Sequence, residues 1–295
     1  MRCAWALLAF SALAAAQDFS KVQIETVSGG LQFLEGPAWS AREALLYFSD
    51  IPKNHLYRLN PLLADPKKVN LPMVYRADSG GANGNAFDAK GNLYTCESHN
   101  RRVTRTDIKG KVEVLADQWQ GKKLNAPNDI VVRHDGHVYF TDPAFGHEAD
   151  SRELDFYGVF HITPKGELSV VAKPAGRPNG ITLSPDGKTL YVADSDNHRI
   201  LAYALDHAGE ASGERVALAN IEGVPDGIRT DSNNNLYVAA RHLLVFDPSG
   251  KQLARFQFSE KPSNCAFGGA GLDTLFVTSH GALYRLQLNV KGSGY

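Results

Sequence analysis

One sequence unit recurs six times along this chain, and this repetition constrains the fold more than any other feature. The unit consists of a polar residue, beside Gly or Pro in five of the six copies, then a short apolar strand, a turn, and a second strand with aromatic residues. The copies recur at intervals of 38 to 51 residues. They begin at Glu35-Gly36-Pro37, Asn83-Gly84, Pro127-Asn128-Asp129, Pro178-Asn179-Gly180, Pro225-Asp226-Gly227 and Ser263-Asn264-Cys265. A period of this length with three or four strands in each unit predicts the blades of a propeller.

The turns inside the units predict hairpins of β-strands. Asp88–Asn92 and Ser184–Lys188 supply the Asp, Asn and Gly residues of tight turns. Aromatic and β-branched residues follow, as strands prefer. No helical periodicity extends over ten residues after the first 16, which excludes alternating α/β units. We therefore predict an all-β, six-bladed β-propeller. The alternating segment 22–27 is expected to pair with the last blade and close the ring.

The first 16 residues predict a secretory signal peptide. Arg2 precedes an apolar run that ends in Ala14-Ala15-Ala16, a small-residue cleavage pattern. An N-terminal buried helix is the alternative. No later segment approaches the ~20 apolar residues that a membrane-spanning helix needs. The predicted organisation is a signal peptide at 1–16 and a single propeller domain at 17–295, exported to the periplasm or secreted.

Charge and cysteine content limit the partners of this chain. The formal net charge is -1, from 31 basic and 32 acidic residues, without long runs of either sign. This argues against nucleic acid or anionic lipid as a partner, and no obligatory protein partner is evident. Removal of the signal peptide leaves Cys96 and Cys265, a pair that could form a disulfide outside the cytoplasm. Their apolar, strand-like surroundings favour two buried free thiols instead.

The polar residue that opens each unit predicts an ion site on the propeller axis. The innermost strand of every blade begins beside the central channel, so equivalent residues of six blades converge there. These residues are Glu35, Asn83, Asn128, Asn179, Asp226 and Asn264. Crowded polar groups at a channel cost free energy unless something satisfies them. Carboxylate and amide oxygens without thiol or imidazole favour Ca²⁺, although Asn and Asp beside Gly or Pro also form simple turns.

The ordered motifs resemble those of the gluconolactonase–regucalcin family of six-bladed propellers. Glu35-Gly36-Pro37, Asn128-Asp129, Asn179-Gly180 and Asp226-Gly227 carry the resemblance, together with Tyr139–Pro143 and Asn264–Gly269. The resemblance implies a divalent ion, commonly Ca²⁺ but with Zn²⁺, Mn²⁺ or Mg²⁺ possible. It implies the ligands Glu35, Asn128, Asn179 and Asp226. It also implies that the ion polarises a lactone carbonyl while Asp226 activates water as the general base, with pure metal ligation as the alternative for Asp226.

Two departures from the family pattern concern the substrate. We expect Asn83, Asn128, His99 and Asn264 to contact it. The family often has His directly after the Glu of a Cys-Glu pair, but here Ser98 stands there and His99 follows. A one-residue slip along a strand reverses the facing of a side chain, so His99 needs a bulge to reach the substrate, and a solvated loop His is equally consistent. Ala126 replaces an Arg of the animal members, so their sugar specificity does not transfer.

The sequence thus predicts an exported, calcium-dependent lactonase with a small-molecule sugar lactone as substrate. A phosphotriesterase-like hydrolase on the same ion is the first alternative, because the pocket lining and not the fold decides the substrate. A non-catalytic propeller that binds a peptide, glycan or protein is the second. A condensing enzyme like strictosidine synthase is a more distant one, because its chemistry does not require these axial ligands.

Overall fold

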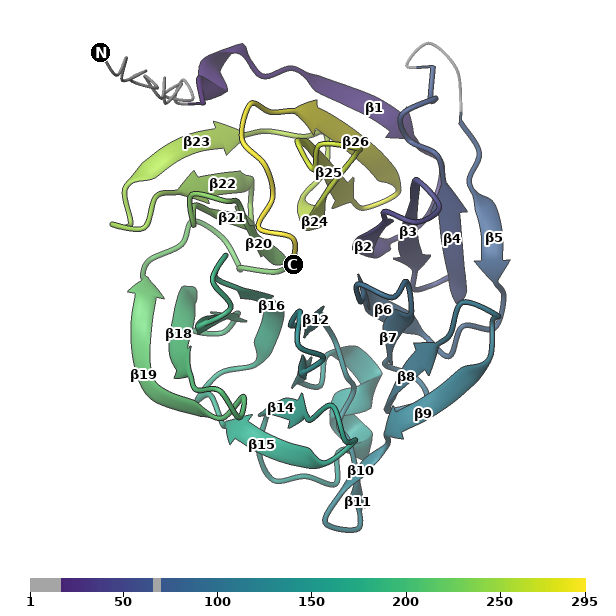
Figure 1. The fold of residues 1–295 in the computed structure, drawn as a ribbon, viewed down its shortest axis with the longest axis vertical. Coiled ribbons are helices and arrows are strands. Elements are labelled where there is room, and N and C mark those ends of the chain that lie inside the picture. Colours follow the sequence, from purple (N-terminus) through teal and green to yellow (C-terminus); the bar gives the residue numbers. More distant parts are fainter. Residues whose placement is uncertain (1–16, 66–69) are drawn as a thin grey trace, which may run out of the picture.

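Six four-stranded antiparallel sheets are arranged around a common axis in the computed structural model (Figure 1). The structure describes residues 17–65 and 70–295. The predicted six-bladed, all-β propeller is confirmed. The predicted signal peptide at 1–16 lies outside the described residues.

Each blade has one edge strand next to the axis and the other edge strand on the outside of the ring (Figure 1). Blades 1 to 3 comprise β2 (Leu34–Ser40), β3 (Leu45–Asp50), β4 (His55–Leu59) and β5 (Met73–Arg76); β6 (Ala82–Phe87), β7 (Leu93–Glu97), β8 (Arg102–Thr106) and β9 (Val112–Ala116); and β12 (Ile130–Val132), β13 (Val138–Asp142), β14 (Gly158–Ile162) and β15 (Leu168–Ala172). Blades 4 and 5 comprise β16 (Pro178–Leu183), β17 (Thr189–Asp194), β18 (Arg199–Leu205) and β19 (Ala211–Leu218); and β20 (Ile228–Thr230), β21 (Leu236–Ala239), β22 (Leu243–Phe246) and β23 (Gln252–Phe256).

The sixth blade joins the two ends of the chain. It consists of β24 (Pro262–Gly268), β25 (Thr274–Ser279), β26 (Ala282–Gln287) and β1 (Ile24–Ser28). Within the antiparallel pair β1–β26, Ile24 lies opposite Leu286 and Thr26 opposite Tyr284. The prediction that segment 22–27 closes the ring is confirmed, with the strand displaced to 24–28. This pairing covers the edge that β26 would otherwise expose.

Aspartate side chains define the hairpin turns between the first and second strands of several blades. The Oδ1 atom of Asp231 accepts hydrogen bonds from the backbone amides of Asn233 and Asn235, both at 2.9 Å. Asp88 accepts equivalent bonds from Lys90 at 2.9 Å and Asn92 at 2.8 Å. A short acceptor side chain that bonds to its own following amides favours a turn over a continued strand. The Asp and Asn residues therefore mark where the inner strands of these blades end.

The hydrophobic core lies between neighbouring blades. Clusters of buried side chains bridge successive blades around the ring, and one of them combines Tyr94 and Cys96 of blade 2 with Phe140 and Phe160 of blade 3. Phe140 stacks on Phe160 with ring centroids 5.3 Å apart. Cys96 and Cys265 are both buried and free, as predicted. Burial raises the pKa of the Cys265 thiol to about 12, so this thiol stays protonated at neutral pH.

Helical structure in the described residues is limited to two short 3₁₀ turns, η1 (Phe19–Lys21) and η2 (Gly146–Ser151). The turn η2 lies in the connection between β13 and β14. A small hairpin, β10 (Gln118–Trp119) with β11 (Lys122–Lys123), precedes blade 3. Over residues 17–65 and 70–295, no helix has the length and apolarity to cross a bilayer.

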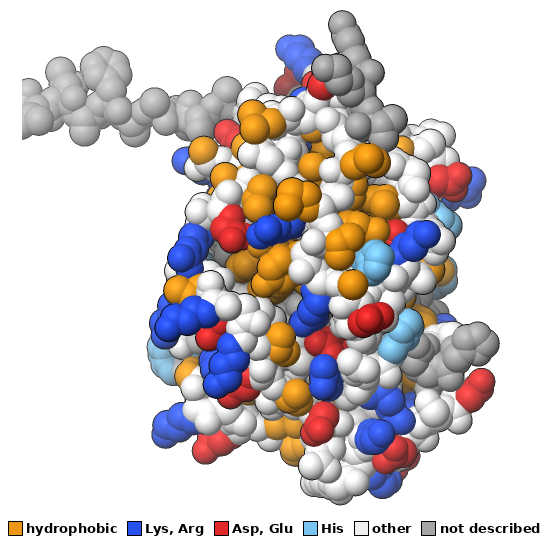
Figure 2. All heavy atoms as spheres, turned by 90° about the vertical axis from the view of Figure 1, so that its right-hand side faces the viewer, with side chains coloured by type: hydrophobic (Ala, Val, Ile, Leu, Met, Phe, Trp, Pro, Cys, Tyr) orange, Lys and Arg blue, Asp and Glu red, His pale blue; other side chains and the backbone are white. Residues whose placement is uncertain are grey.

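Exposed apolar side chains gather on the outer wall of blades 1 and 2. Figure 2 shows them on the side that faces right in Figure 1, over the outermost strands. Leu63 is 81% exposed and Met73 is 61% exposed at blade 1, and Val112 and Val114 are exposed on β9. These residues lie on the circumference of the ring, so they do not contribute to the channel.

Candidate functional site

The six polar residues predicted for the axis lie at one end of the channel, where the innermost strands begin. Glu35, Asn83 and Asn179 are the second residues of β2, β6 and β16. Asn264 is the third residue of β24, while Asn128 and Asp226 stand just before β12 and β20. Because these six strands run in the same direction along the channel, their first residues meet at the same end. We call this end the polar end.

Glycine after the polar residue allows neighbouring strands to approach at the polar end. Gly36 has a φ of 51°, and a Cβ there would lie 2.0 Å from the backbone oxygen of Asn83. At Gly180 a Cβ would lie 2.3 Å from the oxygen of Asp226, which accepts a hydrogen bond from the Gly180 amide at 3.1 Å. Only a residue without a side chain fits such contacts. The recurring glycine thus holds the polar residues of adjacent blades close together.

Glu35 is a buried carboxyl group at the centre of the polar end. Its side-chain Oε2 accepts hydrogen bonds from the Gly36 amide at 2.9 Å and from Asn264 Nδ2 at 3.2 Å. Burial, followed by repulsion from the nearby Asp226, holds the pKa of Glu35 well above its usual range. Two carboxyl groups in one poorly solvated space require a proton or a cation to neutralise them.

Asp226 faces this group from blade 5. Its side chain is 14% exposed and lies 3.3 Å from Lys261 Nζ. Burial raises the pKa of Asp226 to about 6, while Lys261 and a hydrogen bond from Asn179 oppose that rise and the charge of Asp129 adds to it. A carboxylate with such a pKa is a stronger base than an ordinary aspartate and is still ionised at neutral pH. Lys261 partly compensates its charge from the rim of the channel.

Asp129 is a third acidic residue of this cluster that the sequence analysis did not select. Its side chain is 1% exposed, and its Oδ2 lies 3.3 Å from Arg229 Nη1 and 3.5 Å from Asn264 Nδ2. It follows Asn128 directly, at the position where four other copies carry glycine. The substitution of a carboxyl group for glycine in one repeat was the signal that could have identified it.

The structure brings Glu35, Asn264, Asp226 and Asn179 into one interacting group. Hydrogen bonds to their backbone oxygens hold Asn83 and Asn128 at the same end of the channel. The Gly84 amide donates to the backbone oxygen of Asn128 at 2.7 Å, and the Ser49 hydroxyl donates to the backbone oxygen of Asn83 at 2.8 Å. Within the described residues, neither side-chain amide of these two asparagines makes a hydrogen bond. Both amides are therefore available to a ligand.

His99 lies at the rim of the polar end. It is exposed in the turn after β7, and a Cβ at Gly81 would lie 2.4 Å from its Cγ, so the ring covers the segment that leads to Asn83. The alternation of facing along a strand does not apply to His99, because β7 ends at Glu97. Its contact with substrate stays a prediction. Ala126 is buried and offers only a methyl group in this region.

The donor set at the polar end fits a hard divalent cation. In the described part of the chain, no group of three or more His, Cys, Asp or Glu side chains has an arrangement that could hold a metal. The predicted ligand set is of another kind, because it combines two carboxyl groups with two amides. The mutual repulsion of Glu35 and Asp226 and the unused amide of Asn128 match oxygen ligation of a cation such as Ca²⁺.

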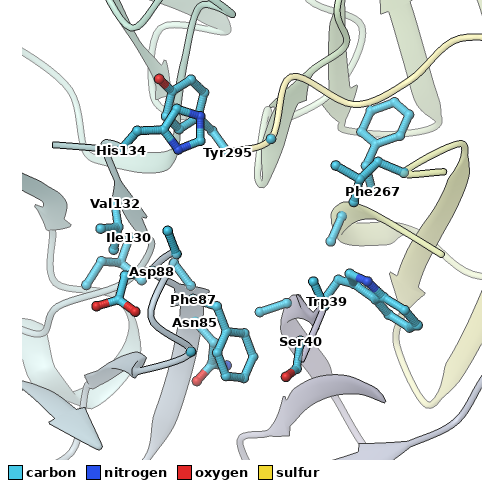
Figure 3. Close-up of a pocket in the computed structure, with 18 of the residues that line it drawn as sticks. Trp39, Ser40, Asn85, Phe87, Asp88, Ile130, Val132, His134, Phe267 and Tyr295 are labelled. Atoms are coloured by element: carbon cyan, nitrogen blue, oxygen red, sulfur yellow. The ribbon is translucent and has the colours of Figure 1, made fainter. Parts of the chain in front are cut away.

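A cavity of about 390 Å³ opens at the opposite end of the channel (Figure 3). Its walls come from the last residues of the innermost strands and from the turns that follow, including Trp39, Phe87, Val132 and Phe267. None of the six predicted axial residues lines it. We call it the lower cavity. The six polar residues and this cavity thus occupy different ends of the same channel.

Comparison with known proteins gives one consistent family. A family model described as "SMP-30/Gluconolactonase/LRE-like region" matches residues 33–281. The gluconolactonase of Zymomonas mobilis is 31% identical, covering 91% of this chain and 82% of that protein. The structure of a gluconolactonase from Xanthomonas campestris is 32% identical, with a TM-score of 0.82 over 90% of both chains. A calcium-binding protein, regucalcin, from Agrobacterium tumefaciens shares the fold, with a TM-score of 0.77 over 92% of this chain and 95% of that one at 21% identity.

Proposed function

The chain belongs to the SMP-30/gluconolactonase/LRE-like family, and on this premise we propose that it is a metal-dependent hydrolase that opens a sugar lactone. The observation that carries the proposal is the pair of buried carboxyl groups, Glu35 and Asp226, whose pKa values are both raised at the polar end of the channel. Neighbouring carboxyl groups with raised pKa values are typical of catalytic and metal-binding sites. The gluconolactonase relatives support a lactone as the substrate.

Glu35, Asn128, Asn179 and Asp226 would hold the ion, which we propose to be Ca²⁺. When bound, the ion would polarise the carbonyl group of the lactone. Asp226 accepts a proton from water as the water oxygen attacks the carbonyl carbon. The ring C–O bond then breaks, and Asp226 returns the proton to the departing oxygen, which gives the hydroxy acid. Asn83, Asn264 and His99 surround the place of reaction and would orient the hydroxyl groups of the sugar.

The deciding experiment is hydrolysis of δ-gluconolactone by the purified protein. We expect activity to disappear with EDTA, to return with Ca²⁺ and to fall at least ~100-fold in Asp226→Asn. Asp117→Asn is the matched control, because Asp117 is exposed and its backbone oxygen makes the contact to Leu124. Hydrolysis of several lactones at no more than the spontaneous rate would overturn the proposal. Phosphotriesters, and then ligand binding without turnover, would be tested next.

We also propose that the protein acts outside the cytoplasm after cleavage behind Ala16. The short apolar run and the Ala14-Ala15-Ala16 sequence support this. Fractionation of the cells that make the protein, followed by mass determination of the intact chain, tests it. A mass that begins at Gln17 in the exported fraction is expected. Full-length protein confined to the cytoplasm contradicts it.

A further inference from the structure

The lower cavity has the size and the walls of a small-molecule site. Its volume of about 390 Å³ falls within the range of ligand pockets, ~300–1,000 Å³. Trp39, Phe87, Phe267 and Tyr295 lie around it, and Figure 3 shows these rings on different sides of the same space. Trp39 is fixed by stacking on Phe276 with ring centroids 5.9 Å apart, and Tyr295 packs on His134 at 4.4 Å. Rigid aromatic walls favour an apolar body in the ligand.

A buried arginine lines the deep end of this cavity. Arg229 is 4% exposed. Its Nη1 donates to Ile228 O at 2.7 Å, to Ile181 O at 3.2 Å and to Asp129 Oδ2 at 3.3 Å. Among the described residues, no acceptor binds its Nε or Nη2. A guanidinium presents five donors in a planar fork, so a carboxylate in the cavity would satisfy the edge that the protein leaves open.

The charges around the cavity favour an anion. Arg42 and Lys90 are exposed at its mouth. The carboxylate of Asp88 is engaged by the amides of Lys90 and Asn92 and by Asn92 Nδ2 at 2.7 Å. Arg133 adds a cation that is paired with Asp135 at 2.8 Å, as Arg229 is with Asp129. The neutral donors around Asp88 leave it one negative charge against the two positive charges of Arg42 and Lys90, so the balance of charge at the mouth is positive.

We propose that the lower cavity is a second binding site, which takes a small monoanion: a carboxylate on an apolar or aromatic body. The carboxylate binds Nε and Nη2 of Arg229, and the body packs between Trp39 and Phe267. This site is separate from the proposed lactonase site, because the Asp129–Arg229 pair stands between the two ends of the channel. The inference does not depend on the proposed function.

Phenylacetate and its uncharged analogue phenylacetamide form a matched pair of probes. Titration calorimetry gives their affinities, and a Trp119→Phe protein leaves Trp39 as the only tryptophan of residues 17–295, so its fluorescence reports on the cavity. We expect phenylacetate to bind with a Kd in the millimolar range or below and to change the Trp39 emission. Phenylacetamide should bind at least ~10-fold more weakly. Equal affinity of the two probes, or no binding of either up to ~20 mM, would overturn the proposal.

Three variants locate the site. Arg229→Met should reduce phenylacetate affinity at least ~10-fold, whereas its effect on phenylacetamide should be small. Ala266→Phe puts a large side chain into the cavity and keeps Arg229, so it should abolish binding even if Arg229→Met fails to fold. Arg215→Gln, on the exposed strand β19, is the control and should bind normally. Binding that survives Ala266→Phe contradicts the proposal, and so does binding that is lost on addition of EDTA or in Asp226→Asn.

Discussion

The two ends of the channel are built by the same six strands, yet they carry different side chains. At the polar end the strands begin with amide and carboxyl side chains, among them Glu35 and Asp226, whose pKa values are raised. At the opposite end, around the lower cavity, the same strands finish with aromatic and aliphatic residues such as Trp39 and Val132. The propeller provides the convergence of six equivalent positions, and the residue type at each position provides the chemistry.

The boundary between the ends is formed by residues that break the repeat. Asp129 occupies a position where most copies have glycine, and Arg229 extends from β20 to meet it. Asp129 Oδ2 also accepts from Asn264 Nδ2, which in turn donates to Glu35. A charged pair in the middle of the channel therefore separates the acidic polar end from a cavity lined by aromatic, aliphatic and basic residues.

Breaking the Asp129–Arg229 pair should cause the largest loss in the free energy of unfolding. Asp129→Asn leaves the Arg229 guanidinium buried without its counter-charge, and we expect the free energy of unfolding to fall by about 3–5 kcal/mol. Urea denaturation measures the change. The double variant Asp129→Asn/Arg229→Met should recover part of the loss, because it no longer buries a lone charge. Strictly additive losses would show that the two side chains do not depend on each other.

Removal of the repulsion between Glu35 and Asp226 at the polar end should reduce activity without reducing the stability of the metal-free protein. Glu35→Gln keeps the shape of the side chain but eliminates one carboxyl charge. We expect lactone hydrolysis to fall at least ~100-fold, with weaker binding of Ca²⁺ in calorimetry, while the metal-free protein unfolds at an equal or higher temperature. A metal-free protein that is strongly destabilised would mean that Glu35 serves the fold and not the ion.

The smallest effect is expected from the pair His137 and His161, which lies outside the channel. A change there should alter the free energy of unfolding and leave activity unchanged. His161 is fully buried, and its Nε2 lies 2.6 Å from His137 Nδ1. Burial lowers the pKa of His161 to about 4. Because the folded pKa lies below the unfolded value, the stability is complete above pH 6.5 and is lost as the pH falls towards 4, by at most about 3 kcal/mol. His161→Gln should flatten the slope of unfolding free energy over this range, with lactonase activity at pH 7 unchanged. An unaltered slope would assign the acid sensitivity to other groups.

The polar end could be predicted from sequence because its residues recur in phase. Six copies of one pattern identify both the blade number and the residues that begin the inner strands, and no long-range contact needs to be known. Lys261 was not predictable in this way. It lies on a connection outside the repeated unit, and only the folded ring brings it to Asp226.

No repeated pattern in the sequence predicts the lower cavity, in contrast to the polar end. Trp39, Val132 and Phe267 have the composition of ordinary core strands, so nothing distinguishes a residue that lines a cavity from one that fills it. Tyr295 reaches the cavity from the far end of the chain because the Ser293 amide donates to Thr230 O at 3.0 Å. The orientation of His99 could not be predicted, because it depends on whether β7 ends before or after this residue. The ends of strands are the features that sequence predicts least well.

The closure of the ring by β1 has a consequence for the order in which the chain can fold. The guanidinium of Arg285 bonds to Glu25 at 2.7 Å, across a separation of 260 residues. A strand that leaves the ribosome early must therefore wait for its partner until β26 has also been made. During that interval β1 exposes unpaired edges, which can recruit other chains. The last step of folding is also the one with the longest loop to close, so we expect it to limit the rate at which the intact ring appears.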